Sequence, residues 1–126
     1  MNVVDSSGWL EYFTKGENTA FFAPVIYATD TLLVPTICLY EVYKRIVSQL
    51  EDDEEALAAI VWMATGRVVD LNQEIALNAA VISLEHKLAM ADSIIFATAR
   101  HYDAILWTQD AHFNGLDDVR YIEKKK

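Results

Sequence analysis

Three acidic side chains stand where a short apolar segment or an apolar helix meets a loop, and a fourth lies within a predicted helix. Asp5 and Asp110 each follow a short apolar segment, and Asp92 opens the apolar run SIIFATA. Because ligands of open α/β sheets bind beyond the carboxyl ends of the strands, we expect these three acids to share one crevice. The fourth acid, Glu41, lies on a mixed polar and apolar face of a predicted helix, which suggests that it lines a groove.

Carboxylates gathered at one spot repel one another, which raises their pKa unless a cation is present. Oxygen ligands select hard ions, Mg²⁺ or Mn²⁺, over zinc. Such an ion lowers the pKa of a bound water and stabilises charge on an attacked phosphate, so the four acids predict phosphodiester hydrolysis. Taken singly, each acid also fits an ordinary structural role, as a cap, a helix-dipole partner, a turn former or a solvated glutamate. Only their combination favours a metal.

Composition limits the class of protein. The chain has 126 residues, which fits one domain, and its 53% apolar content fits a packed core. The single cysteine, Cys38, excludes a disulfide framework and a zinc-cysteine cluster, and it suits the cytoplasm. The longest apolar run covers nine residues, 56–64, well short of the ~20 that span a bilayer. A net charge of −9 argues against simple phosphate binding, favours bound cations and suits a basic protein partner.

Five short apolar segments alternate with longer stretches of helical period. The strands are expected at 3–4, 32–34, 67–70, 104–107 and 119–122. The helices are expected to reach residue 13 from Ser6 or Ser7, and to cover 18–28, 36–50, the EDDEE run to near 66, 72–87 and 91–102. This alternation predicts a parallel sheet covered on both faces, a single α/β domain over residues 1–126.

Three local features lead to further expectations. Ser6 or Ser7 is expected to cap the first helix, which would leave the Asp5 carboxylate free to face the crevice. Tyr40 is expected to pack in the core rather than to stack on a base. The buried stripe of the helix over 36–50 is expected to consist of Leu39, Val42, Tyr43, Ile46 and Leu50.

Four stretches carry a resemblance to a known family. VVDSSGWLEYF, PTICLYEVYKRI, LAMADSIIFATAR and ILWTQDAHFNGL occur in this order, and together they resemble the PIN domain, within it the VapC-type ribonuclease toxins. The resemblance covers essentially the whole chain and implies a three-layer α/β/α sandwich with a short, mostly parallel central sheet. The residues that it implies for catalysis and metal binding are Asp5, Glu41, Asp92 and Asp110, with Ser7, Thr108 and Asn114 in support. Asn114 stands where the family often has a further acid, and it brings no charge.

The resemblance also implies an activity and partners. These are an endoribonuclease dependent on Mg²⁺ or Mn²⁺, a homodimer, and a small DNA-binding antitoxin of the VapB kind that covers the groove. The alternatives left open are an inert PIN-like module that binds proteins, and a solitary RNA-processing nuclease without an antitoxin.

Basic side chains near the predicted groove are candidates for contact with RNA phosphates. They are Lys44, which shares the helix face of Glu41, Arg45 and Arg100. The tail 124–126 is expected to be a solvated end. The three histidines, at 86, 101 and 112, show no metal-binding spacing and are expected at the surface, although His112 lies close enough to Asp110 to enter the groove.

Overall fold

Five short strands form one sheet in which every neighbouring pair runs parallel. The computed structural model describes residues 1–125. The spatial order of the strands is β3-β2-β1-β4-β5. Their bounds are β1 Asn2–Val4, β2 Leu32–Pro35, β3 Arg67–Val69, β4 Ile105–Thr108 and β5 Val119–Tyr121. The predicted α/β architecture is confirmed, and the sheet is parallel throughout.

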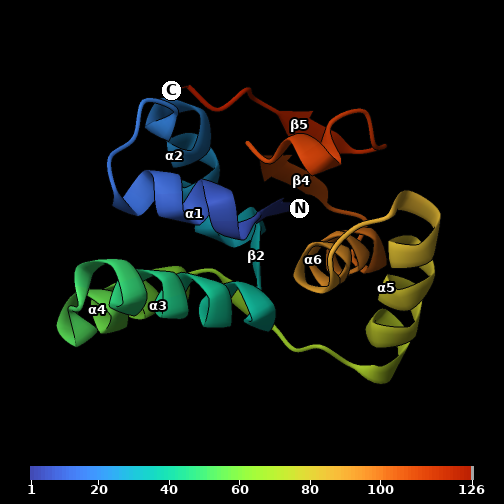
Figure 1. Cartoon of the computed structure of the whole chain (residues 1–126), viewed down its shortest axis with the longest axis horizontal. Coiled ribbons are helices and arrows are strands. Elements are labelled where there is room, and N and C mark those ends of the chain that lie inside the picture. The colour runs from blue at the N-terminus through green and yellow to red at the C-terminus, as the bar shows by residue number, and fades with distance from the viewer. Residues whose placement is uncertain (126) are drawn as a thin grey trace.

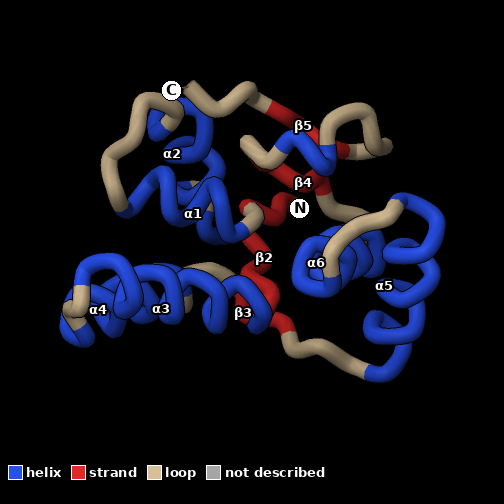
Figure 2. Tube along the Cα trace, viewed as in Figure 1, coloured by secondary structure: helices blue, strands red, loops and turns tan. Residues whose placement is uncertain are grey.

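Helices cover both faces of this sheet. The helices α1 to α4 lie on one side of the strands and α5 and α6 on the other (Figures 1 and 2), which gives the predicted three layers. Their bounds are α1 Ser6–Phe13, α2 Thr19–Tyr27, α3 Thr36–Leu50, α4 Asp53–Met63, α5 Gln73–His86 and α6 Met90–His101, with 3₁₀ turns η1 Thr29–Thr31 and η2 Ala111–Phe113. Each predicted element is found within a few residues of its expected bounds.

The order of the strands places a crevice between β1 and β4. The chain moves outward from β1 to β2 and β3, and then returns through α5 and α6 to place β4 against the other side of β1. Strand order therefore reverses between β1 and β4, and such a switch point is where open α/β sheets bind ligands. Asp5 directly follows β1, and Asp110 comes two residues after β4.

The core lies on both faces of the central strands. Val3, Val4, Leu33 and Leu106 have no exposed surface, as expected for parallel strands covered on two sides. In α6 the whole run 93–99 is buried, which confirms that the apolar run after Asp92 forms an interior helix. Within residues 1–125, no helix combines the length and the apolar character needed to cross a bilayer.

The buried face of α3 differs from the predicted one. Val42 and Ile46 are buried as expected, but they share their face with Cys38 rather than with Tyr43 or Leu50. Tyr43 is 37% exposed and Leu50 is 57% exposed. The prediction failed because α3 is apolar on two sides: one packs into the core, and the other borders an apolar groove against α4 that stays open to solvent.

Candidate metal centre

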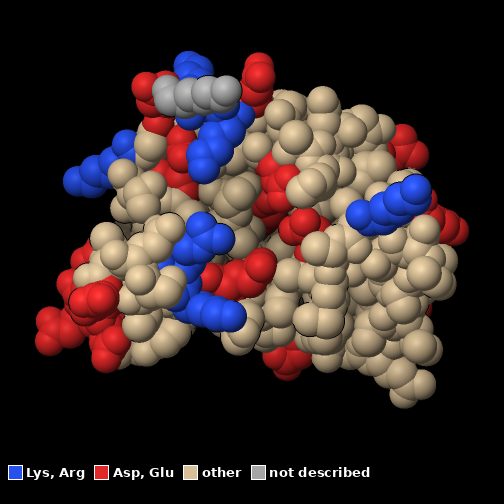
Figure 3. Space-filling view, viewed as in Figure 1, with Lys and Arg blue, Asp and Glu red and all other residues tan. Residues whose placement is uncertain are grey.

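A cleft of about 700 Å³ opens at the carboxyl ends of β1 and β4. Figure 3 shows acidic side chains inside a hollow on this face, with lysine and arginine side chains beside it. The residues that line the cleft include all four acids singled out in the sequence: Asp5, Glu41, Asp92 and Asp110. The fold therefore brings together carboxylates from β1, α3, α6 and the segment after β4.

Asp5 is the most deeply buried of the four, with 2% of its surface exposed. Its Oδ1 accepts a hydrogen bond from the backbone N–H of Gly8 at 2.9 Å, so Asp5 itself is the N-cap of α1. The expectation that Ser6 or Ser7 would cap this helix is wrong. Asp5 is the single extended residue between β1 and α1, which is the position from which a short carboxylate reaches the first free N–H groups.

Two hydroxyl groups complete the surroundings of the Asp5 carboxylate. Ser7 Oγ lies 2.8 Å from Oδ1 and 2.9 Å from Oδ2. Thr108 Oγ1 donates to Oδ2 at 2.6 Å and accepts from the backbone N–H of Asp110 at 2.9 Å. Thr108 therefore positions both Asp5 and Asp110.

The protonation of two acids reflects their burial. Burial raises the pKa of Asp5 to about 7, although hydrogen bonds from Thr108, Gly8 and Ser7 favour the charged form. Burial, together with the negative charges of Asp110 and Glu41, raises the pKa of Asp92 to about 6. Both carboxyl groups are therefore harder to ionise than in water, mainly because they are buried, and a nearby cation would offset that cost.

Glu41 has a hydrogen-bond donor that the sequence did not reveal. The hydroxyl of Ser6, which is buried against α3, donates to Glu41 Oε1 at 2.6 Å. The bond joins the first residue of α1 to the middle of α3, 35 positions later in the chain. Only the packing of these two helices shows this contact, because no local spacing links the two residues.

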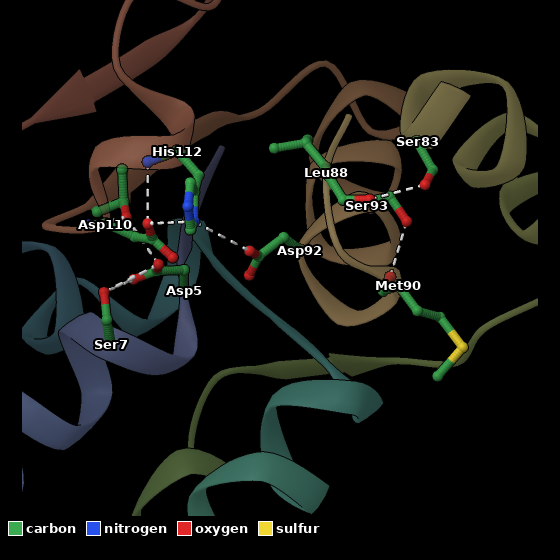
Figure 4. Close-up of polar contacts among 10 residues, drawn as sticks. Asp5, Ser7, Ser83, Leu88, Met90, Asp92, Ser93, Asp110 and His112 are labelled. Carbon is green, nitrogen blue, oxygen red and sulfur yellow. Dashed lines mark hydrogen bonds and ion pairs between the residues drawn. The ribbon is translucent and has the colours of Figure 1, made fainter. Parts of the chain in front are cut away.

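Asp92 and Asp110, which line the cleft, lie close to the imidazole of His112. One ligating atom from each residue lies within 4.8 Å of the other two. His112 Nδ1 is 3.1 Å from Asp110 Oδ1 and 4.0 Å from Asp92 Oδ2. Figure 4 shows these side chains and Asp5 pointing toward one another from different elements. Two carboxylates and an imidazole, beside two further acids, fit a divalent cation.

The remaining predicted residues divide between the cleft and other surfaces. Lys44 and Arg45 line the cleft, whereas Arg100 lies over the ring of Phe96 and borders a separate depression between α5 and α6. Asn114 is exposed at the end of η2, and across residues 1–125 no hydrogen bond joins its side chain to the four acids. In the tail 124–126, Lys124 is exposed, as expected for a solvated end, and it also lines the cleft. Position 126 of that tail lies outside the described residues.

Comparison with known proteins identifies the family. The sequence pattern of the PIN domain matches residues 3–119 of this chain. The chain belongs to the PIN domain family. No curated protein is similar enough in sequence to this PIN domain to serve as a relative.

Solved structures share the fold of this PIN domain at low sequence identity. A toxin–antitoxin complex from Klebsiella pneumoniae gives a TM-score of 0.77 at 22% identity, covering 95% of this chain and 96% of that one. DNA-bound VapBC from Salmonella typhimurium gives 0.76 at 17% identity, covering 97% and 96%. VapC20 of Mycobacterium tuberculosis, a toxin that cleaves the sarcin–ricin loop, gives 0.73 at 18% identity, covering 95% and 99%. At these identities the likeness concerns the fold.

A polar network below the cleft holds the segment between Thr108 and Asp110 of this PIN domain. The side chain of Gln109 is buried; it donates to Glu11 at 3.2 Å and accepts from Asn18 at 3.0 Å. Asn18 also donates to the backbone carbonyl of residue 123 at 3.1 Å. Sequence reasoning missed this network, because its members are 7 to 105 residues apart and none is part of a recognisable motif.

Tyr40 lies at the rim of the same cleft. Its side chain is 59% exposed, so the prediction that it packs in the core is wrong. It lies beside Lys44, whose Nζ is 5.5 Å from the centre of the tyrosine ring. An exposed ring next to a cation is available to stack on a base.

Proposed function

We propose that this PIN domain is a metal-dependent endoribonuclease and the toxin of a type II toxin–antitoxin system. The observation that carries the proposal is the convergence of Asp5, Glu41, Asp92 and Asp110 on one cleft of a PIN fold. The shared fold with VapBC proteins, one of them a toxin that cleaves the sarcin–ricin loop, supports the toxin role.

The cofactor that suits this cleft is Mg²⁺ or Mn²⁺. Asp92 and Asp110 would hold it, with Asp5 and Glu41 as the other two acids of the site. When bound, such an ion lowers the pKa of a water molecule and stabilises charge on the attacked phosphate. The raised pKa values of Asp5 and Asp92 fit this assignment, because a nearby cation offsets the cost of ionising buried carboxylates.

The residues around the acids fix them before substrate arrives. Ser7, Gly8 and Thr108 hold the Asp5 carboxylate from three directions, and Ser6 fixes Glu41. A preorganised site loses little free energy to reorganisation during the reaction, so these contacts favour a catalytic role over a purely structural one.

Cationic side chains on the walls of the cleft would take the RNA backbone. Lys44 and Arg45 come from α3, and Lys124 comes from the C-terminal segment. They offset locally the net charge of −9, which would otherwise repel phosphate. Arg100 is not part of this proposal because it lies at a separate depression.

The proposed partner is a small DNA-binding antitoxin of the VapB kind. Its inhibitory segment should present arginine or lysine to the acidic cleft, since charge-assisted hydrogen bonds to carboxylates are strong. We also propose a homodimer, which the exposed apolar residues of α5, Leu77, Val81 and Leu84, would suit as a contact surface. An adjacent small reading frame that encodes a basic tail would support the antitoxin.

The decisive experiment measures cleavage of RNA with Mg²⁺ or Mn²⁺ by the wild type and by Asp5→Asn. Cleavage should fall by a factor of roughly 10³, because losing one charge of a preorganised site costs about 3–4 kcal/mol of barrier height. Asp30→Asn, which changes an exposed acid in η1, is the matched control and should keep full activity. Activity that survives both chelation and Asp5→Asn would contradict the proposal.

Calorimetry with Mn²⁺ separates the nuclease from an inert PIN-like module. The nuclease should take up Mn²⁺ at millimolar concentration or below, whereas no uptake would favour the module. A toxin should also purify with its antitoxin when the adjacent gene is co-expressed. Cleavage of RNA without such a partner would favour a solitary RNA-processing nuclease.

A further inference from the structure

We propose that His112 is a direct nitrogen ligand of this metal centre, and that it makes the site prefer Mn²⁺ to Mg²⁺. This inference rests on the proposed function, because it adds a ligand to the metal site assigned there. It also specifies the chemistry of the site, which changes from oxygen ligands alone to a mixed set of two carboxylates and one imidazole.

The separations of the three ligating atoms suit one shared ion. Neighbouring ligands of an octahedral ion at ~2.1 Å are about 3.0 Å apart, and opposite ligands are about 4.2 Å apart. His112 Nδ1 lies 3.1 Å from Asp110 Oδ1 and 4.0 Å from Asp92 Oδ2. Both distances fall within the range that separates the ligands of one such ion, and the ligating atoms of Asp92 and Asp110 lie within 4.8 Å of each other.

The local backbone holds the imidazole at this place. Asp110 is the N-cap of η2, and its Oδ1 accepts from the backbone N–H of His112 at 2.9 Å. The next residue, Phe113, is fully buried, and it anchors the turn in the core. His112 therefore stands on a short, fixed turn whose imidazole lies between Asp110 and Asp92 (Figure 4).

The chemistry of imidazole favours Mn²⁺ and later transition metals. Mg²⁺ prefers oxygen ligands and keeps much of its water, whereas imidazole suits transition metals more than Mg²⁺. With Nδ1 facing the ion, Nε2 carries the proton, and the 75% exposed side chain leaves solvent within its reach. The two other histidines stand elsewhere: His86 packs near Phe96, and His101 packs on Tyr102 beside Glu74.

The test is pulsed electron paramagnetic resonance of bound Mn²⁺, which detects the ¹⁴N nucleus of a directly bound imidazole. The wild type should show nitrogen coupling, and His112→Gln should lose it. His86→Gln and His101→Gln are the matched controls and should keep the coupling. His86 and His112 are exposed, and the side chain of His101 is 24% exposed at the end of α6, so the fold should survive each change.

Titration calorimetry with Mn²⁺ and Mg²⁺ supplies the second readout. Changes to residues that only support metal ligands already cost 10- to 100-fold in affinity, so His112→Gln should bind Mn²⁺ about tenfold or more weakly. His112→Asp restores an oxygen ligand, and it should shift the ratio of the two dissociation constants toward Mg²⁺ by about tenfold.

The outcomes distinguish this inference from the proposed function. Nitrogen coupling that disappears only in His112→Gln supports it. Mn²⁺ bound without nitrogen coupling in the wild type overturns it and leaves the carboxylate site standing, particularly if Asp92→Asn weakens binding. A wild type that binds no Mn²⁺ overturns both the inference and the proposed metal dependence.

Discussion

Asp5 has two roles at the scale of a single residue. Its carboxylate caps α1 through Gly8 and also faces the cleft, where Thr108 and Ser7 bind it. The sequence suggested that a cap and a ligand were alternatives for this residue. A carboxylate has about four lone-pair positions, so a capped and hydrogen-bonded aspartate still has room for a further partner.

The raised pKa of Asp5 predicts how stability depends on pH in the metal-free protein. The pKa is 3.8 in the unfolded chain and about 7 in the folded one, so the folded state binds more protons between these values. This contribution to the free energy of unfolding is fully present below pH 4 and is lost as pH rises through 7, by at most roughly 4 kcal/mol.

Thermal unfolding in a chelator across this range checks the prediction. The difference in Tm between Asp5→Asn and the wild type should grow as pH rises, with the variant the more stable at pH 8. Mn²⁺ should stabilise the wild type at that pH. Parallel curves of Tm against pH for the two proteins would show that Asp5 has the same pKa in the folded protein as in water.

Ser6 should matter for activity more than for folding. Without its hydroxyl, Glu41 loses a 2.6 Å hydrogen bond and the constraint on its carboxylate. Ser6→Ala should therefore lower the cleavage rate by about 10- to 100-fold, as supporting residues of metal sites do. Ser48→Ala is the control, since Ser48 lines the same cleft but donates only to a backbone carbonyl on its own helix. Equal cleavage rates for both variants would contradict a role for Ser6 in positioning Glu41.

At the scale of elements, the site depends on the hydrogen bonds that hold the carboxyl ends of β1 and β4 together. The strands pair in parallel over Asn2–Val4 and 105–107, and Thr108 then bonds across their ends to Asp5. The same hydroxyl accepts from the N–H of Asp110, so one side chain sets the spacing of two acids.

Removing this hydroxyl should destabilise the fold and loosen the site together. Thr108→Val keeps the shape but leaves a buried carboxylate oxygen without its donor, which should cost about 1–3 kcal/mol in the free energy of unfolding. Thr108→Ser keeps the hydroxyl and should cost clearly less. Urea unfolding of both variants in chelator measures the difference. Similar losses would assign the effect to packing of the methyl group.

The helices and strands were predictable from the sequence because local patterns of apolar residues indicate where each one lies. The strands were predicted from short continuous apolar segments and the helices from a helical period, since burial of those side chains drives their formation. The contacts of Ser6 and Gln109 were not predictable, because each joins segments that are distant in the chain. The face of α3 was misjudged for the same reason: what packs on each side is decided by other elements.

The four acids were found because all of them belong to motifs that the sequence shows directly. The placement of His112 was only partly predictable. Its closeness to Asp110 follows from two positions of spacing, but its approach to Asp92 depends on how η2 sits over α6. Asn114, four positions after Asp110, lies beyond the turn and is exposed.

For the molecule as a whole, the position of its charged side chains matters more for RNA binding than its net charge. The chain carries −9, yet Lys44, Arg45 and Lys124 lie around the cleft. Lys44→Ala with Arg45→Ala should raise the KM for RNA about tenfold. It should also lower the slope of the logarithm of the binding constant against the logarithm of salt concentration. The decrease should correspond to about two phosphate contacts, one for each cation removed. Arg100→Ala, outside the cleft, should change neither quantity, and an equal effect would place RNA over a wider surface.

The pairing of β1 with β4 has a consequence for synthesis of the chain. Asp5 is made at the start, but its partner Thr108 is made 103 residues later, and Asp110 follows still later. A nascent chain or a fragment that ends before residue 105 lacks the strand β4 and the cleft residues that follow it. Under the proposed function, no nuclease would exist until the ribosome had passed Thr108 and Asp110, and translation interrupted earlier would release inactive pieces.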